Sequence, residues 1–218
     1  MFDYSLSHWA TFFSAAFLLN ISPGPDLAFI LGQTAKGGIK AGIYAMFGIW
    51  TGAFMHVILA ALGLSAVLAT SVIAFSMVKW FGAAYLVWLG IQAFRSKGAN
   101  ISVNDSIPSK GLIEIFRQGI MVAILNPKVA VFFLAFLPQF VEPDLGPVSA
   151  QFFLHGILII MVAGFVEPPL ILVGGQLTTY LNKNNNVSRW IDRGFGTILI
   201  GLALKLAIGN QGRTKITA

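Results

Sequence analysis

The sequence predicts an all-α integral membrane protein whose six transmembrane helices form a 3+3 inverted repeat, with proline-broken helices in first and fourth place. Three observations predict this fold: an apolar composition, six long apolar runs, and proline breaks at matching places in the two halves. Of the 218 residues, 56% are hydrophobic and 10% are charged, whereas soluble domains have about 45–50% and about 25%. The apolar runs are continuous rather than alternating, which favours helices over the strands of a membrane barrel.

Each helix that crosses a bilayer needs about 20 mostly apolar residues. The runs long enough to do so are Leu6–Gln33, Ala41–Ala69, Ser71–Phe94, Leu112–Phe140, Ala150–Leu177 and Trp190–Gly209. Some exceed the length of a perpendicular crossing, so tilt, kinks or interfacial ends must take up the excess. No Lys or Arg precedes Lys36, so the first run lacks the basic start of a cleavable signal peptide and is expected to be a retained helix.

A polar stretch divides the chain almost in half. Residues 96–110, which include Asp105 and Pro108, are expected to form a loop between pseudo-repeats 1–95 and 111–210 of a single membrane domain, 1–218. Around the prolines the halves resemble each other, with Phe17-Leu18-Leu19-Asn20 before the first break and Ala123-Ile124-Leu125-Asn126 before the second. Three helices per half reverse the direction of the second half in the membrane, which makes the repeat inverted.

The placement of Lys and Arg predicts orientation, because cytoplasmic loops carry an excess of both. The basic residues gather in or beside the connections after the odd-numbered runs, and they are Lys36, Lys40, Arg95, Lys97, Lys110, Arg117, Lys183, Arg189 and Arg193. We therefore expect these connections to be cytoplasmic and both termini to lie outside. A re-entrant first or fourth helix would change this parity. The net charge of +6 then reflects topology and contact with anionic membrane lipid, not nucleic-acid binding.

The two proline breaks predict a binding site. One is Asn20-Ile21-Ser22-Pro23-Gly24-Pro25-Asp26, and the other is Asn126-Pro127-Lys128. Ser and Asn are strong helix N-caps and proline suits the first helical position, so each break can begin a half-helix whose free N–H groups face the protein interior. Such an end can bind a carboxylate. The alternative is a simple proline kink, but two breaks at matching positions favour binding.

Three charged residues lie within apolar sequence. Asp26 and Lys128 flank the breaks, and a charge at the bilayer centre costs about 2.5–3.5 kcal/mol on the insertion scale, so such residues face a cavity or each other. They predict either a structural ion pair or a pair that opens as substrate enters. Glu167 directly precedes Pro168-Pro169 at a third expected break. We expect Asp26 or Glu167 to couple transport to protons, the alternative for Glu167 being a structural acid at a kink.

His56 and Gln139 are secondary candidates for the site. A proton relay through His56 or His155 is conceivable, but the histidines are scattered and lack ligand spacing, so we expect no metal. The chain contains no cysteine, which excludes disulfides and thiolate sites, and we expect no cofactor. Gly38-xxx-Gly42 and Gly48-xxx-Gly52 allow close helix packing. Packing within the fold is the favoured reading, and a homodimer face is the alternative.

Several segments resemble the lysine-exporter (LysE-type) translocator family, specifically its homoserine/threonine efflux (RhtB-type) branch. They are Ser22-Pro23-Gly24-Pro25-Asp26, the stretch from Val78 to Ile91, and Leu125-Asn126-Pro127-Lys128 followed by Phe136-Leu137-Pro138-Gln139-Phe140. The resemblance implies a bacterial inner-membrane exporter of small amino acids driven by the proton gradient. One departure is the acid of the fifth run, which is Glu167 where that branch has an aspartate about a turn away.

Together these features predict secondary active efflux of a homoserine-like, threonine-like or other neutral or basic amino acid, by proton antiport with alternating access. The half-helix ends would hold the substrate carboxylate and Asp26 its ammonium group. A membrane scaffold or assembly factor without transport is the alternative from another class, and export of another small solute is a further one. An intramembrane enzyme is disfavoured, because Ser22 has no evident base.

Overall fold

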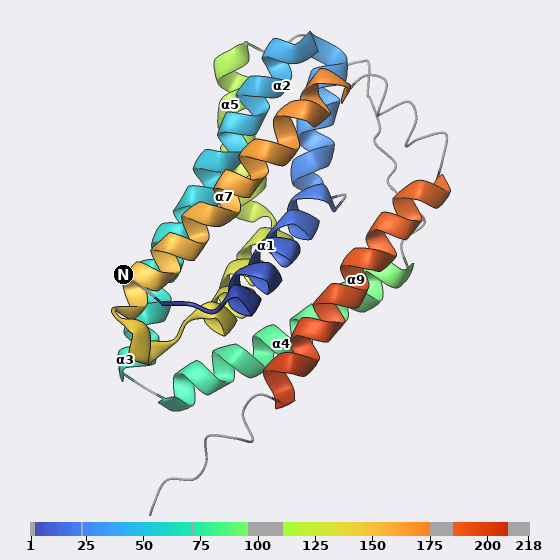
Figure 1. Ribbon diagram of the computed structural model, residues 1–218. Coiled ribbons are helices and arrows are strands. Elements are labelled where there is room, and N and C mark those ends of the chain that lie inside the picture. Colours follow the sequence, from blue (N-terminus) through green and yellow to red (C-terminus); the bar gives the residue numbers. More distant parts are fainter. Residues whose placement is uncertain (1–2, 23, 71, 96–110, 175–184, 209–218) are drawn as a thin grey trace, which may run out of the picture.

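The computed structural model describes residues 3–22, 24–70, 72–95, 111–174 and 185–208, which form helices with no strand among them (Figure 1). In chain order the elements are α1 (Leu6–Ile21), α2 (Pro25–Leu59), η1 (Ala60–Leu64), α3 (Ser65–Thr70), α4 (Val72–Arg95), α5 (Leu112–Leu125), α6 (Pro127–Val131), η2 (Phe132–Phe136), η3 (Leu137–Phe140), η4 (Pro143–Leu145), α7 (Val148–Leu172) and α9 (Asn185–Ile208). The all-α prediction is confirmed for this part of the chain. Pro23 and the loop expected at 96–110 lie outside it.

Both proline breaks begin new helices, as the sequence predicts. α1 ends before Ser22, and α2 starts at Pro25 after an extended Gly24. α5 ends before Asn126, whose backbone is extended (φ −75°, ψ 109°), and α6 starts at Pro127. Proline fits this first position because its fixed φ is already helical and no N–H is needed there. The helices on either side of the second break are bent by 52°.

The sequence also places a turn inside α2. Gly38 has φ +73°, a conformation that glycine adopts without the steric cost that a side chain brings. Figure 1 shows the first part of α2 climbing to one end of the molecule and the second part running back. The turn falls between the first and second predicted runs, so residues 25–37 belong with α1 and residues 39–59 form a separate segment.

Aromatic and glycine residues fix how the helices pack. Phe12, Phe136, Phe140 and Phe152 are fully buried where α1, the η2–η3 segment and α7 meet. α2 packs on α5 with the backbones in close approach, since a methyl group on Gly119 would lie 2.7 Å from the Ala45 carbonyl oxygen. Gly48 and Gly52 face the same contact, so these predicted packing glycines serve the interior of the fold.

α4 and α9 form a second pair, which runs beside the remaining helices in Figure 1. Their contact is reciprocal: a Cβ on Gly90 would lie 3.0 Å from the Gly196 carbonyl oxygen, and a Cβ on Gly196 would lie 2.8 Å from the Gly90 carbonyl oxygen. The third predicted helix of one half therefore packs on the third of the other.

Two helical stretches in the described residues are long and apolar enough to cross a membrane, Pro25–Val67 and Val148–Leu172. The bent pair Leu112–Leu125 and Pro127–Phe140 makes a third if it is one span, whereas α1 is shorter, with 16 residues. Many large apolar side chains are exposed, as expected for contact with lipid; they include Phe17, Leu62, Ile73, Phe81, Leu125, Phe165 and Leu172. These features fit a helical membrane protein, while six separate spans stay a prediction.

Candidate functional site

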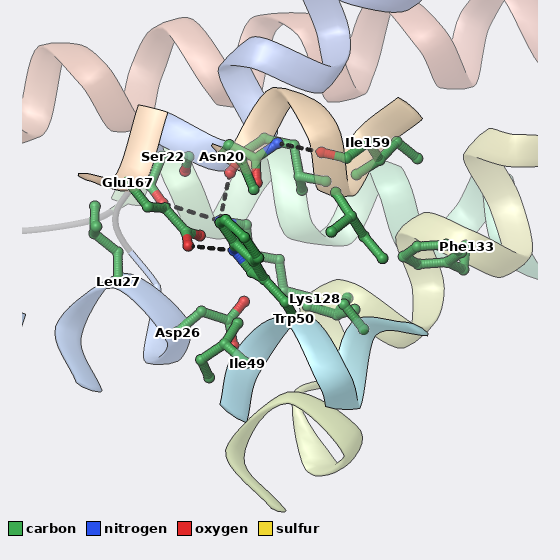
Figure 2. Close-up of a pocket in the computed structure, with 15 residues that line it drawn as sticks. Asn20, Ser22, Asp26, Leu27, Ile49, Trp50, Lys128, Phe133, Ile159 and Glu167 are labelled. Carbon is green, nitrogen blue, oxygen red and sulfur yellow. Dashed lines mark hydrogen bonds between the residues drawn. The ribbon is translucent and has the colours of Figure 1, made fainter. Parts of the chain in front are cut away.

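A small cavity lies where the two proline breaks meet (Figure 2). Polar side chains from four places in the chain share it with apolar ones, as is usual for small-molecule sites. The lining residues are Leu19, Asn20, Ser22, Asp26, Leu27, Ile49, Trp50, Ala53, Lys128, Val129, Phe133, Ile159, Ile160, Ala163 and Glu167. The cavity measures about 40 Å³. One water needs about 10–15 Å³ of such volume, so the cavity would have to widen before it could hold the amino acid that the sequence predicts as substrate.

Asn126 joins the two breaks. Its Nδ2 donates to Asp26 Oδ1 at 2.7 Å, and its Oδ1 accepts from the Lys128 backbone N–H at 2.9 Å. The second bond is an N-cap of α6. Asp26 lies in the first turn of α2, where the positive end of the helix dipole stabilises a carboxylate. One amide thus satisfies the start of one half-helix and holds the acid of the other.

Lys128 contacts the carbonyl end of α1. Its Nζ donates to the Leu19 carbonyl oxygen at 3.0 Å and to the Ser22 carbonyl oxygen at 2.9 Å. The last carbonyls of a helix lack intrahelical donors, and a cation there is stabilised by the dipole. Gly24 leaves room for this approach, because a Cβ on it would lie only 3.2 Å from Lys128 Nζ. Lys128 and Asp26 also interact electrostatically, so the structure brings the predicted pair of charges into one site.

Glu167 is the second acid of the cavity and is only 5% exposed. Trp50 Nε1 donates to Glu167 Oε2 at 2.7 Å, and Figure 2 shows the two side chains pointing toward each other. Contrary to the expected third break, α7 continues past Pro168 and Pro169 to Leu172. Prolines are tolerated in membrane helices where neighbouring groups satisfy the freed backbone.

Two further polar residues complete the lining. Ser22 is 2% exposed, and Asn20 Nδ2 donates to the carbonyl oxygens of Ala16 at 2.8 Å and Ile159 at 3.4 Å. Asn20 therefore ties the end of α1 to α7. Pro25 and Pro127 begin the half-helices next to the cavity without lining it.

The two secondary candidates lie elsewhere. The ring nitrogen Nε2 of His56 is 3.2 Å from the Ala123 carbonyl oxygen, which joins α2 to α5. His56 is near enough to act electrostatically on Asp26 but does not line the cavity. Gln139 lies in η3, outside the lining.

The roles of Trp50 and Asp192 were not predicted from the sequence. Trp50 stands in the middle of an apolar run, where a packing role is the default. Asp192, between Arg189 and Arg193, resembles part of a charged helix start, yet it is buried in α9 and acts electrostatically on Lys128. Only the folded chain brings these residues to the breaks.

A second polar cluster joins the start of α1 to the start of α7. His8 Nε2 and His155 Nε2 are 3.0 Å apart although the residues are 147 positions apart, and His155 Nδ1 is 2.9 Å from the Gln151 carbonyl oxygen. Since a carbonyl only accepts, His155 donates through Nδ1 and accepts from His8 through Nε2. No group of three or more metal-ligating side chains occurs in the described residues.

Glu142 and Tyr4 extend this cluster. Glu142 Oε1 lies 3.6 Å from His8 Nδ1, and the Tyr4 hydroxyl donates to Gln151 Oε1 at 2.6 Å. Burial, with a contribution from Glu142, raises the pKa of Tyr4 to about 12. Tyr4 therefore keeps its proton and remains a donor at physiological pH.

Comparison with known proteins identifies relatives along nearly the whole chain. Residues 17–210 match the family model described as "LysE type translocator". An uncharacterized membrane protein of Vibrio cholerae is 29% identical over 91% of this chain and 96% of its own length. Homoserine/homoserine lactone efflux proteins of Salmonella typhimurium and Salmonella typhi are 29% and 30% identical, each over 91% of this chain and 95% of their own. No solved structure matches.

Proposed function

The chain belongs to the LysE-type translocator family, and on that premise we propose that it exports small amino acids or their derivatives across the bacterial inner membrane in exchange for protons. It is a transporter and not an enzyme. The observation that carries the proposal is the cavity between the proline breaks, where Asp26, Lys128 and Glu167 meet in apolar surroundings. The printed names of the two Salmonella relatives support amino-acid-derived substrates.

The proposed architecture is a six-helix 3+3 inverted repeat. Two observations support it: the matching helix starts at Pro25 and Pro127, and the reciprocal contact of Gly90 with Gly196. A pseudo-two-fold axis between the halves would produce both. Broken helices near the midplane of such repeats are where transporters bind their substrates.

The proposed orientation has the odd-numbered connections in the cytoplasm and the termini in the periplasm. In Figure 1 the turn within α2, the start of α5 and the end of α7 lie at one end, and the N-terminus and the start of α7 lie at the other. The exposed side chains of Lys36, Lys40 and Arg117 belong to the first end, which supports its cytoplasmic placement.

Alternating access then requires the two breaks to part. Opening must break the two hydrogen bonds of Lys128 to the α1 carbonyl oxygens and the hydrogen bond of Asn126 to Asp26, and other partners must replace them. A hydrogen bond that involves a charged group contributes about 1.5–3 kcal/mol, whereas binding with a Kd of 1 mM provides about 4 kcal/mol. Three such bonds contribute about 4.5–9 kcal/mol together, which exceeds that binding free energy, so contacts with the substrate or with water must replace part of the bonds that opening breaks. The carboxylate subsite expected at the half-helix ends stays a prediction.

Proton coupling follows from competition for the same carboxylates. A buried carboxylate whose charge is not matched is costly, so Asp26 or Glu167 takes a proton when the substrate ammonium leaves. A proton that moves inward gains about 2.3 kcal/mol per 100 mV, which permits roughly fifty-fold accumulation outside before any pH gradient.

Uptake into inverted membrane vesicles tests the proposal. With a panel of labelled amino acids, we expect uptake that an acidic vesicle lumen accelerates and that Asp26→Asn abolishes. Glu114→Gln, which changes an exposed acid in α5, is the matched control and should transport normally. Equal signals from vesicles with and without the protein, for every amino acid, would favour the scaffold alternative; full activity in Asp26→Asn would refute the site.

A further inference from the structure

We propose that His8 and His155 form a latch between α1 and α7 on the periplasmic side, which is closed while the two rings share a hydrogen bond and is released when both rings are protonated. The pair is thus a second proton-binding site, separate from the acids of the cavity. This inference rests on the proposed function for its orientation and for alternating access, and it adds a gate that responds to protons outside.

The pair joins the two halves of the chain. His8 lies in α1 and His155 in α7, and their Nε2 atoms are 3.0 Å apart at the end of the molecule where the N-terminus and the start of α7 lie (Figure 1). Near the other end of α1, Asn20 Nδ2 donates to the carbonyl oxygen of Ile159, which lines the cavity. α1 is therefore held on α7 near both of its ends. Loss of the histidine contact loosens the outer end while the contact at the cavity stays, and an outward opening requires this movement.

The hydrogen bond between the rings tolerates one added proton and not two. His155 Nδ1 donates to the Gln151 carbonyl oxygen at 2.9 Å, so in the neutral pair His8 donates the one proton between the two Nε2 atoms. An added proton on either ring still leaves one Nε2 as donor and the other as acceptor. A second added proton puts an N–H on both Nε2 atoms and removes the acceptor. Two positive rings then face each other at 3.0 Å with His155 fully buried, which is costly, so the doubly protonated pair must separate.

Glu142 connects the pair to the outside and stabilises the first charge. Its Oε1 lies 3.6 Å from His8 Nδ1, and its side chain is 53% exposed whereas that of His8 is 8% exposed. A proton from the periplasm that binds His8 Nδ1 forms an ion pair with Glu142, and His8 can then pass its Nε2 proton to His155 Nε2. The buried ring of His155 is thereby reached from the surface through two contacts.

Histidine supplies the charge change at this contact, because an unperturbed imidazole titrates near about pH 6.5. Tyr4, which stacks on His8 with the ring centroids 4.0 Å apart and donates to Gln151, keeps its proton because burial raises its pKa to about 12. Asp3 and Asp144 are exposed near Tyr4 and Glu142 in the sequence, and the next ionisable residue along α7 is Glu167 of the cavity. The pair also contacts uncharged rings, which are those of Trp9, Phe12 and Phe140.

Protonation on this side acts in the direction that the proposed antiport needs. In the proposed cycle the outside is the acidic side, so protons favour opening of the outer end, where Asp26 or Glu167 takes the coupling proton. The proton that releases the latch returns to the periplasm when the pair closes again. The latch therefore adds no proton to the transport stoichiometry.

Pulsed electron paramagnetic resonance between spin labels on α1 and α7 tests the inference. The chain contains no cysteine, so Ala10→Cys and Ala150→Cys, both at exposed positions, place one label on each helix near the pair. Lowering the pH from 8 to 5 should shift the distance distribution from a short to a long component. The ratio of long to short should rise about five- to tenfold between about pH 6 and about pH 5, since opening binds one additional proton.

A distance distribution that does not change with pH overturns the inference. The measurement needs no transported substrate, so this result leaves the proposed export intact. Absence of any amino acid uptake into vesicles, by contrast, defeats the proposed function itself.

Glutamine variants locate the effect. An amide has both a donor and an acceptor, so His8→Gln and His155→Gln each keep a hydrogen bond to the remaining histidine in either charge state, and each should hold the short distance from pH 8 to pH 5. His56→Gln, which changes the histidine that contacts Ala123, is the matched control and should keep the pH response. A response that persists in folded His155→Gln, or that disappears in folded His56→Gln, overturns the assignment to the pair. A monodisperse elution profile in detergent establishes folding, and the protein with all its histidines decides the proposal where a variant does not fold.

Discussion

Replacing Lys128 by methionine should open the cavity. Methionine keeps the length of the side chain but cannot donate to the carbonyl oxygens of Leu19 and Ser22, which Lys128 Nζ contacts at 3.0 and 2.9 Å. Each such bond contributes about 1.5–3 kcal/mol, so the closed arrangement loses about 3 kcal/mol or more. Apolar packing of the methionine recovers part of this, at about 0.8 kcal/mol per buried methylene. We expect the open population to rise at least about tenfold.

The absence of cysteine from the chain makes this measurable without further changes. Ala163, which lines the cavity and is buried, is replaced by cysteine, and the rate of its reaction with a water-soluble thiol reagent is compared between Ala163→Cys and Ala163→Cys with Lys128→Met. Lys40→Met, an exposed lysine near the turn within α2, is the control. An unchanged or slower rate in a folded Lys128→Met protein would contradict the closing role of these bonds.

Three further predictions concern stability, measured as the melting temperature of the purified protein in detergent. Gly48→Ala should lower the melting temperature, because the added methyl group collides with the Phe116 carbonyl oxygen. Gly32→Ala, which has nothing within 4 Å of the added methyl group, should raise the melting temperature slightly through the higher helix propensity of alanine. Equal effects of the two variants would refute the packing of α2 on α5. Asn126→Ala should cost about 1–2 kcal/mol of stability from the lost cap alone, and a neutral result would refute the capping role. Tyr4→Phe should lower stability at pH 7 through its lost hydrogen bond. In the folded protein the pKa of Tyr4 is raised to about 12, so the stability that the protonated hydroxyl contributes is fully present below pH 10 and is lost as the pH rises to 12. The difference in stability between the native protein and Tyr4→Phe should therefore shrink between pH 10 and pH 12. A difference that stays constant over this range would argue against burial of the hydroxyl.

Local features of the fold were predictable from the sequence, because they depend on adjacent residues. Proline after a capping residue marks the starts of α2 and α6, and the sequence of runs places a turn near Gly38. The expected break at Pro168 was wrong, since a helix held by its neighbours absorbs the missing N–H groups. A proline therefore marks a possible break, and the surrounding contacts decide whether one forms.

The composition of the site was only partly predictable. Asp26, Lys128 and Glu167 stand out because a charge in apolar sequence is costly and needs a reason. The contacts of Trp50 with Glu167 and of His8 with His155 join positions 117 and 147 residues apart. Nothing in the local sequence distinguishes these residues from packing aromatics or isolated histidines. The partners of Lys128 were also not predictable, because they are backbone carbonyl groups, which every residue type carries.

The polar groups at the first proline break are satisfied only by residues from the second half of the chain. Its carbonyl end, at α1, receives the cation Lys128, and its amide end, at α2, carries the anion Asp26, which Asn126 holds. The two side chains that satisfy these groups, those of Asn126 and Lys128, both lie at the start of α6. Separating the halves without a ligand would therefore leave helix-end carbonyls and a carboxylate without partners in surroundings of low dielectric, which is costly. In the proposed transport cycle, a ligand whose ammonium group satisfies the acids would reduce that cost, so opening with substrate bound would be favoured over opening without it. If transport is coupled to protons as proposed, resistance to opening without substrate would also limit the leakage of protons across the membrane.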